Sequence, residues 1–363
     1  MIRLLILLSV AMLAACSQEG RDSFAFVPEA VDYGTQVPVF VASGRDREGN
    51  GYFEYGRAAG ISLSRYTVSV PPVRPLGMVT LASEGYINPR LQYVVSDIAQ
   101  FDGDAAFETE LASALGQSSS KTAVIFVPGF NISFREALYR QAQMMVDLQI
   151  PGVPVLFSWP SANNVLGYGF DRESILYSRN PLEKLIRQAD AAGAEEVVVI
   201  GHSLGALLTM EVLRQMAIRD GGTPSVDFGG IILVSPDIDI ELFRRLAEES
   251  GGLPEPFAIF VSKNDPALRI SALLAGTRDR LGTNTDPALL GNLPVSVIDV
   301  SDFAFDNENL HFTAANSPAL IRILTRAAMA ERETPGSAGP VLGSVMGQGM
   351  ETAVLISPRA LAQ

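Results

Sequence analysis

A serine between two glycines is the residue whose surroundings most clearly predict chemistry. Ser203 stands in the run Gly201-His-Ser-Leu-Gly-Ala206, directly after the apolar run 196–200 and before a segment with helical periodicity. A sharp strand-to-helix turn holds such a serine in a strained conformation with its hydroxyl exposed, and the glycines leave room for neighbouring backbone. The following helix directs free N–H groups and its dipole toward a developing negative charge. The sequence therefore predicts that Ser203 is a nucleophile.

A serine hydroxyl needs a base before it can attack, and histidine is the usual one. The chain has two histidines, His202 and His311. His202 is adjacent to Ser203, so its side chain leaves the turn in another direction, and we interpret it as a packing residue. His311 lies in a polar loop after the last apolar run and before the final amphipathic segment. We expect His311 to be the base.

The acid that orients this base should follow a strand that lies between the serine and the histidine in sequence. Asp265 follows the apolar run 257–261 and is the first choice. Asp237 and Asp239 follow the preceding run, 230–234, and are the alternatives. Any of these aspartates could instead begin a turn or cap a helix.

The elements that position these residues are short apolar runs that alternate with helical patterns. The runs are 123–127, 153–157, 196–200, 230–234, 257–261 and 295–300, and the helical segments lie near 105–115, 133–148, 180–193, 204–219, 238–250 and 317–331. Continuous apolar strands that alternate with helices indicate an α/β fold, with a mostly parallel sheet and helices on both faces. Two earlier runs, 38–43 and 61–70, are predicted to add an antiparallel N-terminal edge.

The composition indicates a globular protein and limits its partners. The chain has 363 residues, of which 47% are hydrophobic and 18% charged, so it has ample material for a core. Its formal net charge of -13 argues against a nucleic-acid partner, because phosphate binding needs clustered Lys and Arg. With two histidines and one cysteine, a multi-histidine metal site is nearly excluded, and we expect neither a metal nor an organic cofactor.

The N-terminus has the pattern of an export signal. Arg3 precedes the apolar run 4–15, which is too short to span a bilayer and ends at Cys16. This pattern resembles the lipobox of bacterial lipoproteins, in which the signal is removed and the cysteine is acylated. We therefore expect residues 1–15 to be a signal peptide and lipid on Cys16 to anchor the protein, which metabolic labelling with a palmitate analogue would detect. By the same resemblance, Ser17 favours the periplasmic side of the outer membrane.

Three further segments follow from composition. We expect a tether over residues 16–36, a folded domain over 37–331 and a flexible low-complexity tail over 332–363, which is rich in Gly, Pro, Ser and Ala.

Several segments of the domain resemble a known family. They are Val124-Ile-Phe-Val-Pro-Gly-Phe-Asn131, Phe157-Ser-Trp-Pro160, Gly201-His-Ser-Leu-Gly-Ala206 and Leu233-Val-Ser-Pro-Asp237. From about Pro38 to Ala330 the chain is similar to bacterial α/β hydrolases of uncharacterised function, whose members look like esterases or lipases. The resemblance implies the α/β-hydrolase fold and a Ser–Asp–His triad.

The resemblance also implies an oxyanion hole made of two backbone N–H groups. One would belong to Leu204, which follows the nucleophile, and the other to Phe130, which follows Gly129. Pro128 stands where many α/β hydrolases have a histidine, so this chain departs from the family pattern at the wall of that hole. Segments 161–178 and 275–294 are the predicted walls of the substrate pocket.

The implied reaction is hydrolysis of a carboxylic ester, of a small molecule or a lipid, through an acyl-enzyme. An acyltransferase or a thioesterase with the same triad is one alternative. A catalytically inactive envelope lipoprotein used for binding is the other.

Overall fold

The computed structural model describes residues 24–47, 53–82, 87–276, 280–306, 310–332 and 354–355. The predicted signal peptide, Cys16 and most of the predicted tail lie outside the described residues. None of the described helices combines the length and apolarity that crossing a bilayer requires.

A single sheet forms the centre of the molecule, with its strands in the order β10-β9-β8-β7-β6-β4-β5-β1-β2-β3. The strands are β1 (Thr35–Arg47), β2 (Phe53–Val70), β3 (Val94–Phe101), β4 (Thr122–Val127), β5 (Val153–Ser158), β6 (Glu196–His202), β7 (Gly230–Val234), β8 (Phe257–Val261), β9 (Ser296–Asp299) and β10 (Val354–Leu355). Strands β4 to β10 pair in parallel, β5 pairs in parallel with β1, and β1, β2 and β3 pair antiparallel. The predicted α/β fold, mostly parallel with an antiparallel N-terminal edge, is confirmed.

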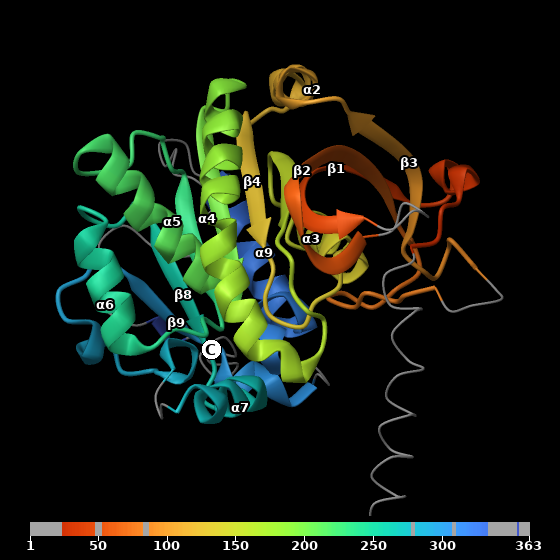
Figure 1. Ribbon diagram of the computed structural model, residues 1–363. Helices are drawn as coiled ribbons and strands as arrows, with labels where there is room; N and C mark the ends of the chain where they lie inside the picture. The colour runs from red at the N-terminus through yellow and green to blue at the C-terminus, as the bar shows by residue number, and fades with distance from the viewer. Residues whose placement is uncertain are drawn as a thin grey trace, which may run out of the picture.

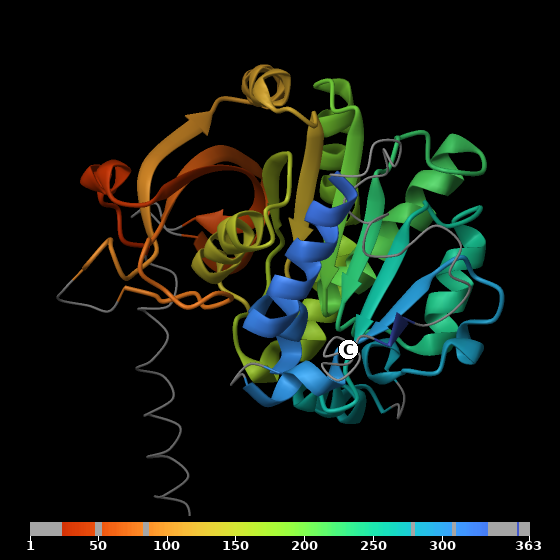
Figure 2. The same cartoon turned by 180° about the vertical axis from the view of Figure 1, so that it is seen from behind.

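Helices cover both faces of this sheet (Figures 1 and 2). The helices are α2 (Asp104–Gln117), α3 (Phe134–Asp147), α4 (Tyr168–Ala191), α5 (Leu204–Asp220), α6 (Ile240–Glu249), α7 (Pro266–Ala275), α8 (Thr313–Asn316) and α9 (Pro318–Arg332). Figure 1 shows α4, α5 and α6 over one face, and Figure 2 shows α9 over the other. The short 3-10 helices are η1 (Pro28–Asp32), η2 (Val165–Gly167), η3 (Leu281–Thr283), η4 (Pro287–Leu290), η5 (Ser301–Asp306) and η6 (Leu310–Phe312).

The alternation of side chains along β4 shows why the sheet is covered on both sides. Ala123, Ile125 and Val127 belong to the core shared with α2, α4, α5 and α6. Val124 and Phe126 belong to the core shared with α3, α8 and α9. Because every residue of β4 is apolar except its first, each face buries an unbroken apolar row. At the antiparallel edge, β1, β2 and β3 curl around α3 (Figure 1).

Two helices differ from the sequence-based expectation. Helix α4 begins at Tyr168, earlier than the predicted 180, and continues through Pro181. Proline usually interrupts a helix, but Ile175 and Leu182 on either side of it pack into one core, so the helix continues. Helix α7 was not predicted because Asp265-Pro266 has the pattern of a turn. In the structure the same pair starts a helix, with aspartate as N-cap and proline as its first residue.

The segment predicted as a tether, 16–36, is described from residue 24 onward. There Ala25 and Val27 exchange backbone hydrogen bonds with Val95 of β3, and the η1 turn follows. The ring of Phe24 packs against Tyr66 at 5.5 Å between centroids. From residue 24 on, this segment therefore lies on the folded domain.

A buried ion pair fastens the segment between β2 and β3 to helix α3. The side chain of Asp147 is 1% exposed and pairs with that of Arg74, which is 7% exposed. Asp147 also accepts hydrogen bonds from the Gly77 N–H at 2.7 Å and from the Gln143 amide at 2.8 Å. This carboxylate therefore holds three groups of the chain together.

Removal of this carboxylate should destabilise the fold strongly. Asp147→Ala leaves the Arg74 guanidinium buried without a counter-ion, so the free energy of unfolding should fall by about 3–5 kcal/mol. Glu195 pairs with Lys121 on the surface, with 63% and 49% of the side chains exposed, and Glu195→Ala should cost less than about 1 kcal/mol. Urea denaturation of the three proteins measures both values. Equal losses for the two variants would contradict this assignment.

Candidate active site

Ser203 lies at the strained turn that joins β6 to α5. Its φ of 54° and ψ of -120° are outside the regions that side-chain-bearing residues normally adopt. The turn fits only because glycine stands two residues later. A Cβ on Gly205 would lie 2.2 Å from the carbonyl oxygen of Val127 in β4. The close approach of the end of β4 to the elbow therefore requires this glycine and fixes the position of the serine.

His311 and Asp265 form a hydrogen-bonded pair. The Nδ1 of His311, on η6, donates to Oδ2 of Asp265 at 2.7 Å. The aspartate is fully buried, whereas the histidine side chain is 18% exposed. The structure therefore brings together two groups that are 46 residues apart in sequence.

The N-terminus of helix α7 fixes the other oxygen of this carboxylate. Oδ1 of Asp265 accepts hydrogen bonds from the N–H groups of Ala267 at 3.0 Å and Leu268 at 3.2 Å. These two bonds satisfy free N–H groups of the first turn of α7 and fix the orientation of the carboxylate. Asp265 therefore caps a helix and orients a histidine at the same time.

The two alternative acids have other partners. Asp237 is buried and contacts Ser271 Oγ at 2.8 Å, Tyr168 Oη at 3.0 Å and Arg280 Nε at 3.1 Å. Asp239 caps α6 through the N–H groups of its first turn. The structure thus places Asp265, and neither alternative, against His311.

His202 does more than pack beside the elbow, which was its interpretation from sequence. Its Nε2 donates to the backbone carbonyl of His311 at 3.0 Å, and its ring lies 4.7 Å from that of His311 and 4.4 Å from that of Phe312. Its Nδ1 is buried without a partner, so the ring carries its proton on Nε2. Burial, followed by the charge of nearby His311, lowers the pKa of His202 well below its ordinary value. His202 is therefore a neutral support for the backbone of His311.

The loop after β4 lies directly against the nucleophile. A Cβ on Gly129 would come within 2.8 Å of the Ser203 Cβ, so only glycine permits this approach. The next residue, Phe130, lines the same cavity as Ser203. On the other side, Leu204 is the first residue of α5, where N–H groups have no acceptor within the helix. The two residues predicted to supply the oxyanion hole therefore lie near Ser203.

Pro128 has its own support in place of the histidine found in many relatives. Its carbonyl accepts a 2.7 Å hydrogen bond from the indole N–H of Trp159, which is fully buried. The wall of the hole is therefore held through the backbone, which a proline can supply.

Sequence reasoning missed a buried polar group that supports the same loop. The Asn131 N–H donates to Ser161 Oγ at 3.1 Å, and Ser161 Oγ donates to Asp171. The guanidinium of Arg45 donates to the Ile132 carbonyl at 2.8 Å. Burial raises the pKa of Asp171 to about 6. Asp171 and Arg45 each stand beside other charged residues in the sequence, so nothing there indicates that they are buried.

Ser203, His311 and Phe130 line one cavity of about 400 Å³. The structure records no hydrogen bond between the Ser203 hydroxyl and His311, and such contacts often tighten only when substrate binds.

The walls of this cavity agree only in part with the prediction. Segment 161–178 contributes Tyr168, as expected. Segment 275–294 was the other predicted wall, but that side is lined by helix α7, which precedes it in sequence. In the described ranges, no three His, Cys, Asp or Glu residues lie close enough together to hold a metal.

Comparison with known proteins identifies the family. Residues 103–328 match the family described as alpha/beta hydrolase of unknown function (DUF900). The chain belongs to this family. The α/β-hydrolase fold inferred from the sequence segments is thereby confirmed, and the matched range contains the elbow, the aspartate and the histidine. A comparison with curated proteins gives no match.

Solved structures give more distant likenesses. A protein assigned as a YdeN-like hydrolase from Pectobacterium atrosepticum has 18% identity and a TM-score of 0.31, over 60% of this chain and 96% of that one. A protein assigned as a hydrolase from Agrobacterium vitis has 11% identity and a TM-score of 0.33, over 82% and 98%. An esterase from Pyrococcus furiosus has 9% identity and a TM-score of 0.33, over 77% and 87%. At TM-scores this low, the likenesses say nothing of the activity of this chain.

The neutral state of His202 predicts how stability depends on pH. Below its ordinary pKa of 6.5, the unfolded histidine binds a proton that the folded one does not, so stability falls as pH falls. Between about pH 7.5 and about pH 5.5, wild type should lose about 1 kcal/mol more than His202→Gln, which cannot titrate. Urea denaturation at both pH values measures the difference, in which groups common to both proteins cancel. An identical pH dependence would show that folded His202 takes up the proton.

Proposed function

We propose that this protein is a serine hydrolase that cleaves a carboxylic ester through a covalent acyl-enzyme. The observation that carries the proposal is the hydrogen bond between His311 and Asp265, in a cavity that also holds the strained serine. A protein that only binds its partner has no need for a serine in a strained backbone conformation. Membership of an α/β hydrolase family agrees with the proposal.

The hydrogen bond to Asp265 determines which nitrogen of His311 can act as the base. Because Nδ1–H donates a hydrogen bond to the carboxylate, the proton of the neutral ring is on Nδ1 and the free lone pair is on Nε2. That nitrogen accepts the Ser203 proton as the hydroxyl oxygen attacks the ester carbonyl carbon. The imidazolium that forms is stabilised by Asp265, whose charge is held by the α7 N-terminus.

The carbonyl oxygen becomes negative in this step, and the two backbone N–H groups of Leu204 and Phe130 would stabilise it. One such donor contributes about 10²–10³ in rate. His311 then gives its proton to the departing alcohol, which leaves the acyl group on Ser203. Water attacks the acyl-enzyme, again with His311 as base, and releases the carboxylic acid and free enzyme.

Fluorophosphonate labelling tests the nucleophile. The wild-type domain should form a covalent adduct, because the probe needs a serine activated by a base. Ser203→Ala should abolish labelling and His311→Ala should slow it by about 10³-fold or more. Glu195→Ala, which removes only the surface pair with Lys121, serves as the control that should still be labelled. Equal labelling of wild type and Ser203→Ala would overturn the proposal.

A pair of conservative substitutions tests the choice of acid. Asp265→Asn should lower kcat for p-nitrophenyl butyrate by about 10⁴-fold, because an amide favours the wrong tautomer of His311. Asp239→Asn is the matched control, since asparagine caps a helix as well as aspartate does, and it should stay within about twofold. If Asp265→Asn kept kcat within about tenfold of wild type, Asp265 would not be the acid.

A further inference from the structure

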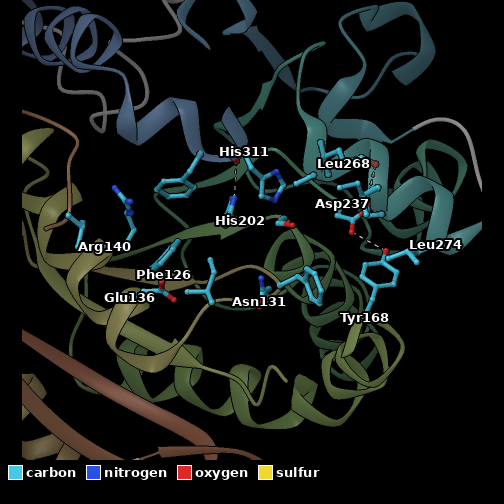
Figure 3. Close-up of a pocket in the computed structure, with 18 of the residues that line it drawn as sticks. Phe126, Asn131, Glu136, Arg140, Tyr168, His202, Asp237, Leu268, Leu274 and His311 are labelled. Carbon is cyan, nitrogen blue, oxygen red and sulfur yellow. Dashed lines mark hydrogen bonds between the residues drawn. The ribbon is translucent and has the colours of Figure 1, made fainter. Parts of the chain in front are cut away.

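The cavity extends to both sides of the two histidines. In Figure 3, His202 and His311 lie between Tyr168, Asp237 and Leu274 on one side and Glu136 and Arg140 on the other. The second side, which we call the α3 arm, is also lined by apolar side chains. They include Phe126, which lies beside Glu136 and Arg140 in Figure 3, and Phe312, whose ring packs against Phe126 and Arg140.

Arg140 is the cation of the α3 arm, and in the part of the chain that the structure describes its guanidinium bonds only to uncharged acceptors. Its Nη1 donates to the carbonyl of Gly77 at 3.0 Å and to the amide oxygen of Gln143 at 2.8 Å, both uncharged acceptors. Among the described residues, no carboxylate oxygen lies within 4.0 Å of its guanidinium. The Nε and Nη2 groups make no hydrogen bond there, and neither is enclosed by protein. They are therefore open to a ligand in the cavity.

The two nearest acids are held by other partners. Glu136 lies four residues before Arg140 on α3, a spacing at which such residues ordinarily form an ion pair. Its Oε2 instead accepts hydrogen bonds from the backbone and hydroxyl of Ser133, which closes a capping box. Asp147 pairs with Arg74.

The surroundings of the Arg140 guanidinium favour the binding of an anion. The guanidinium lies 5.0 Å from the ring centroid of Phe312, and burial lowers the pKa of Arg140 to about 10, which still leaves it charged near neutral pH. Partly buried charges are normally paired, and among the described residues no carboxylate oxygen lies within ion-pair distance of this one. A ligand that brings an anion would supply the missing partner.

We infer that Arg140 binds an anionic group, a carboxylate or a phosphate, carried by the ester substrate on one side of the scissile bond. The planar guanidinium offers N–H pairs whose geometry fits either anion. Glu136 in the same arm weakens the long-range attraction, so recognition should depend on direct contact with Arg140. The inference rests on the proposed ester hydrolysis and specifies its substrate class.

Matched substrate pairs test this subsite. On the acyl side, mono-p-nitrophenyl adipate is compared with p-nitrophenyl hexanoate. On the alcohol side, p-butyryloxybenzoate and p-butyryloxyphenyl phosphate are compared with the methyl ester of p-butyryloxybenzoate. At least one charged substrate should have a higher kcat/KM than its neutral partner. Arg140→Gln should lower that kcat/KM by about 10- to 100-fold and the neutral one by less than about threefold.

Two further variants separate recognition from folding. Arg140→Lys keeps the charge and should retain part of the preference. Arg179 pairs with Glu211 and does not line the cavity, so Arg179→Gln should leave the preference intact. Arg140 also donates a hydrogen bond to the Gly77 carbonyl, so substitutions at this position remove a structural contact as well. A second test therefore uses the wild-type protein alone. Adipate or inorganic phosphate should slow fluorophosphonate labelling of Ser203, whereas uncharged hexanamide should not.

The outcomes distinguish the two proposals. Two results would overturn the anion subsite but not the proposed hydrolase activity. One is hydrolysis of neutral esters with no preference for the charged substrates. The other is an equal fall in kcat/KM for charged and neutral substrates in Arg140→Gln. The absence of both ester hydrolysis and labelling in wild type would overturn the proposed function itself.

Discussion

The site depends on one buried hydrogen bond, between Nδ1 of His311 and the carboxylate of Asp265. It sets the tautomer of the only histidine that can serve Ser203, and it depends in turn on the start of helix α7, which holds the second oxygen. His202 completes the arrangement by binding the backbone of His311 from the elbow side. Ser203, Asp265 and His311 thus follow the carboxyl ends of β6, β8 and β9, the edge at which parallel sheets commonly bind ligands.

Close backbone packing is the second constraint. The loop after β4 lies very close to the elbow. A side chain at Gly129 would collide with the elbow, and one at Gly205 would collide with the end of β4. This approach sets the predicted oxyanion donors beside Ser203. Hydrogen bonds hold the loop in this position. Their side-chain partners are Trp159, Ser161 and Arg45, which are all buried. The carbonyl of Pro128 accepts the indole N–H of Trp159, so this loop is held through its backbone.

The sequence was informative wherever chemistry depends on local spacing. The glycines around Ser203, the scarcity of histidine and the order of the apolar runs were enough to select three residues and the parallel sheet. It was uninformative where contacts are distant along the chain. Helix α7 could not be separated from a turn at Asp265-Pro266, because capping is visible only in three dimensions. The contact of His202 with His311 spans 109 positions, and the pairing of Asp147 with Arg74, which leaves Arg140 without that acid, spans 73.

The central claim is that Ser203 becomes acylated during turnover. Rapid quenching of the wild-type protein with p-nitrophenyl butyrate, followed by peptide mass spectrometry, tests it most directly. The account predicts a burst of p-nitrophenol and a butyryl group on the peptide that contains Ser203, with no such adduct in Ser203→Ala. Turnover of the ester with no acylated peptide, or with the acyl group on another residue, would contradict it.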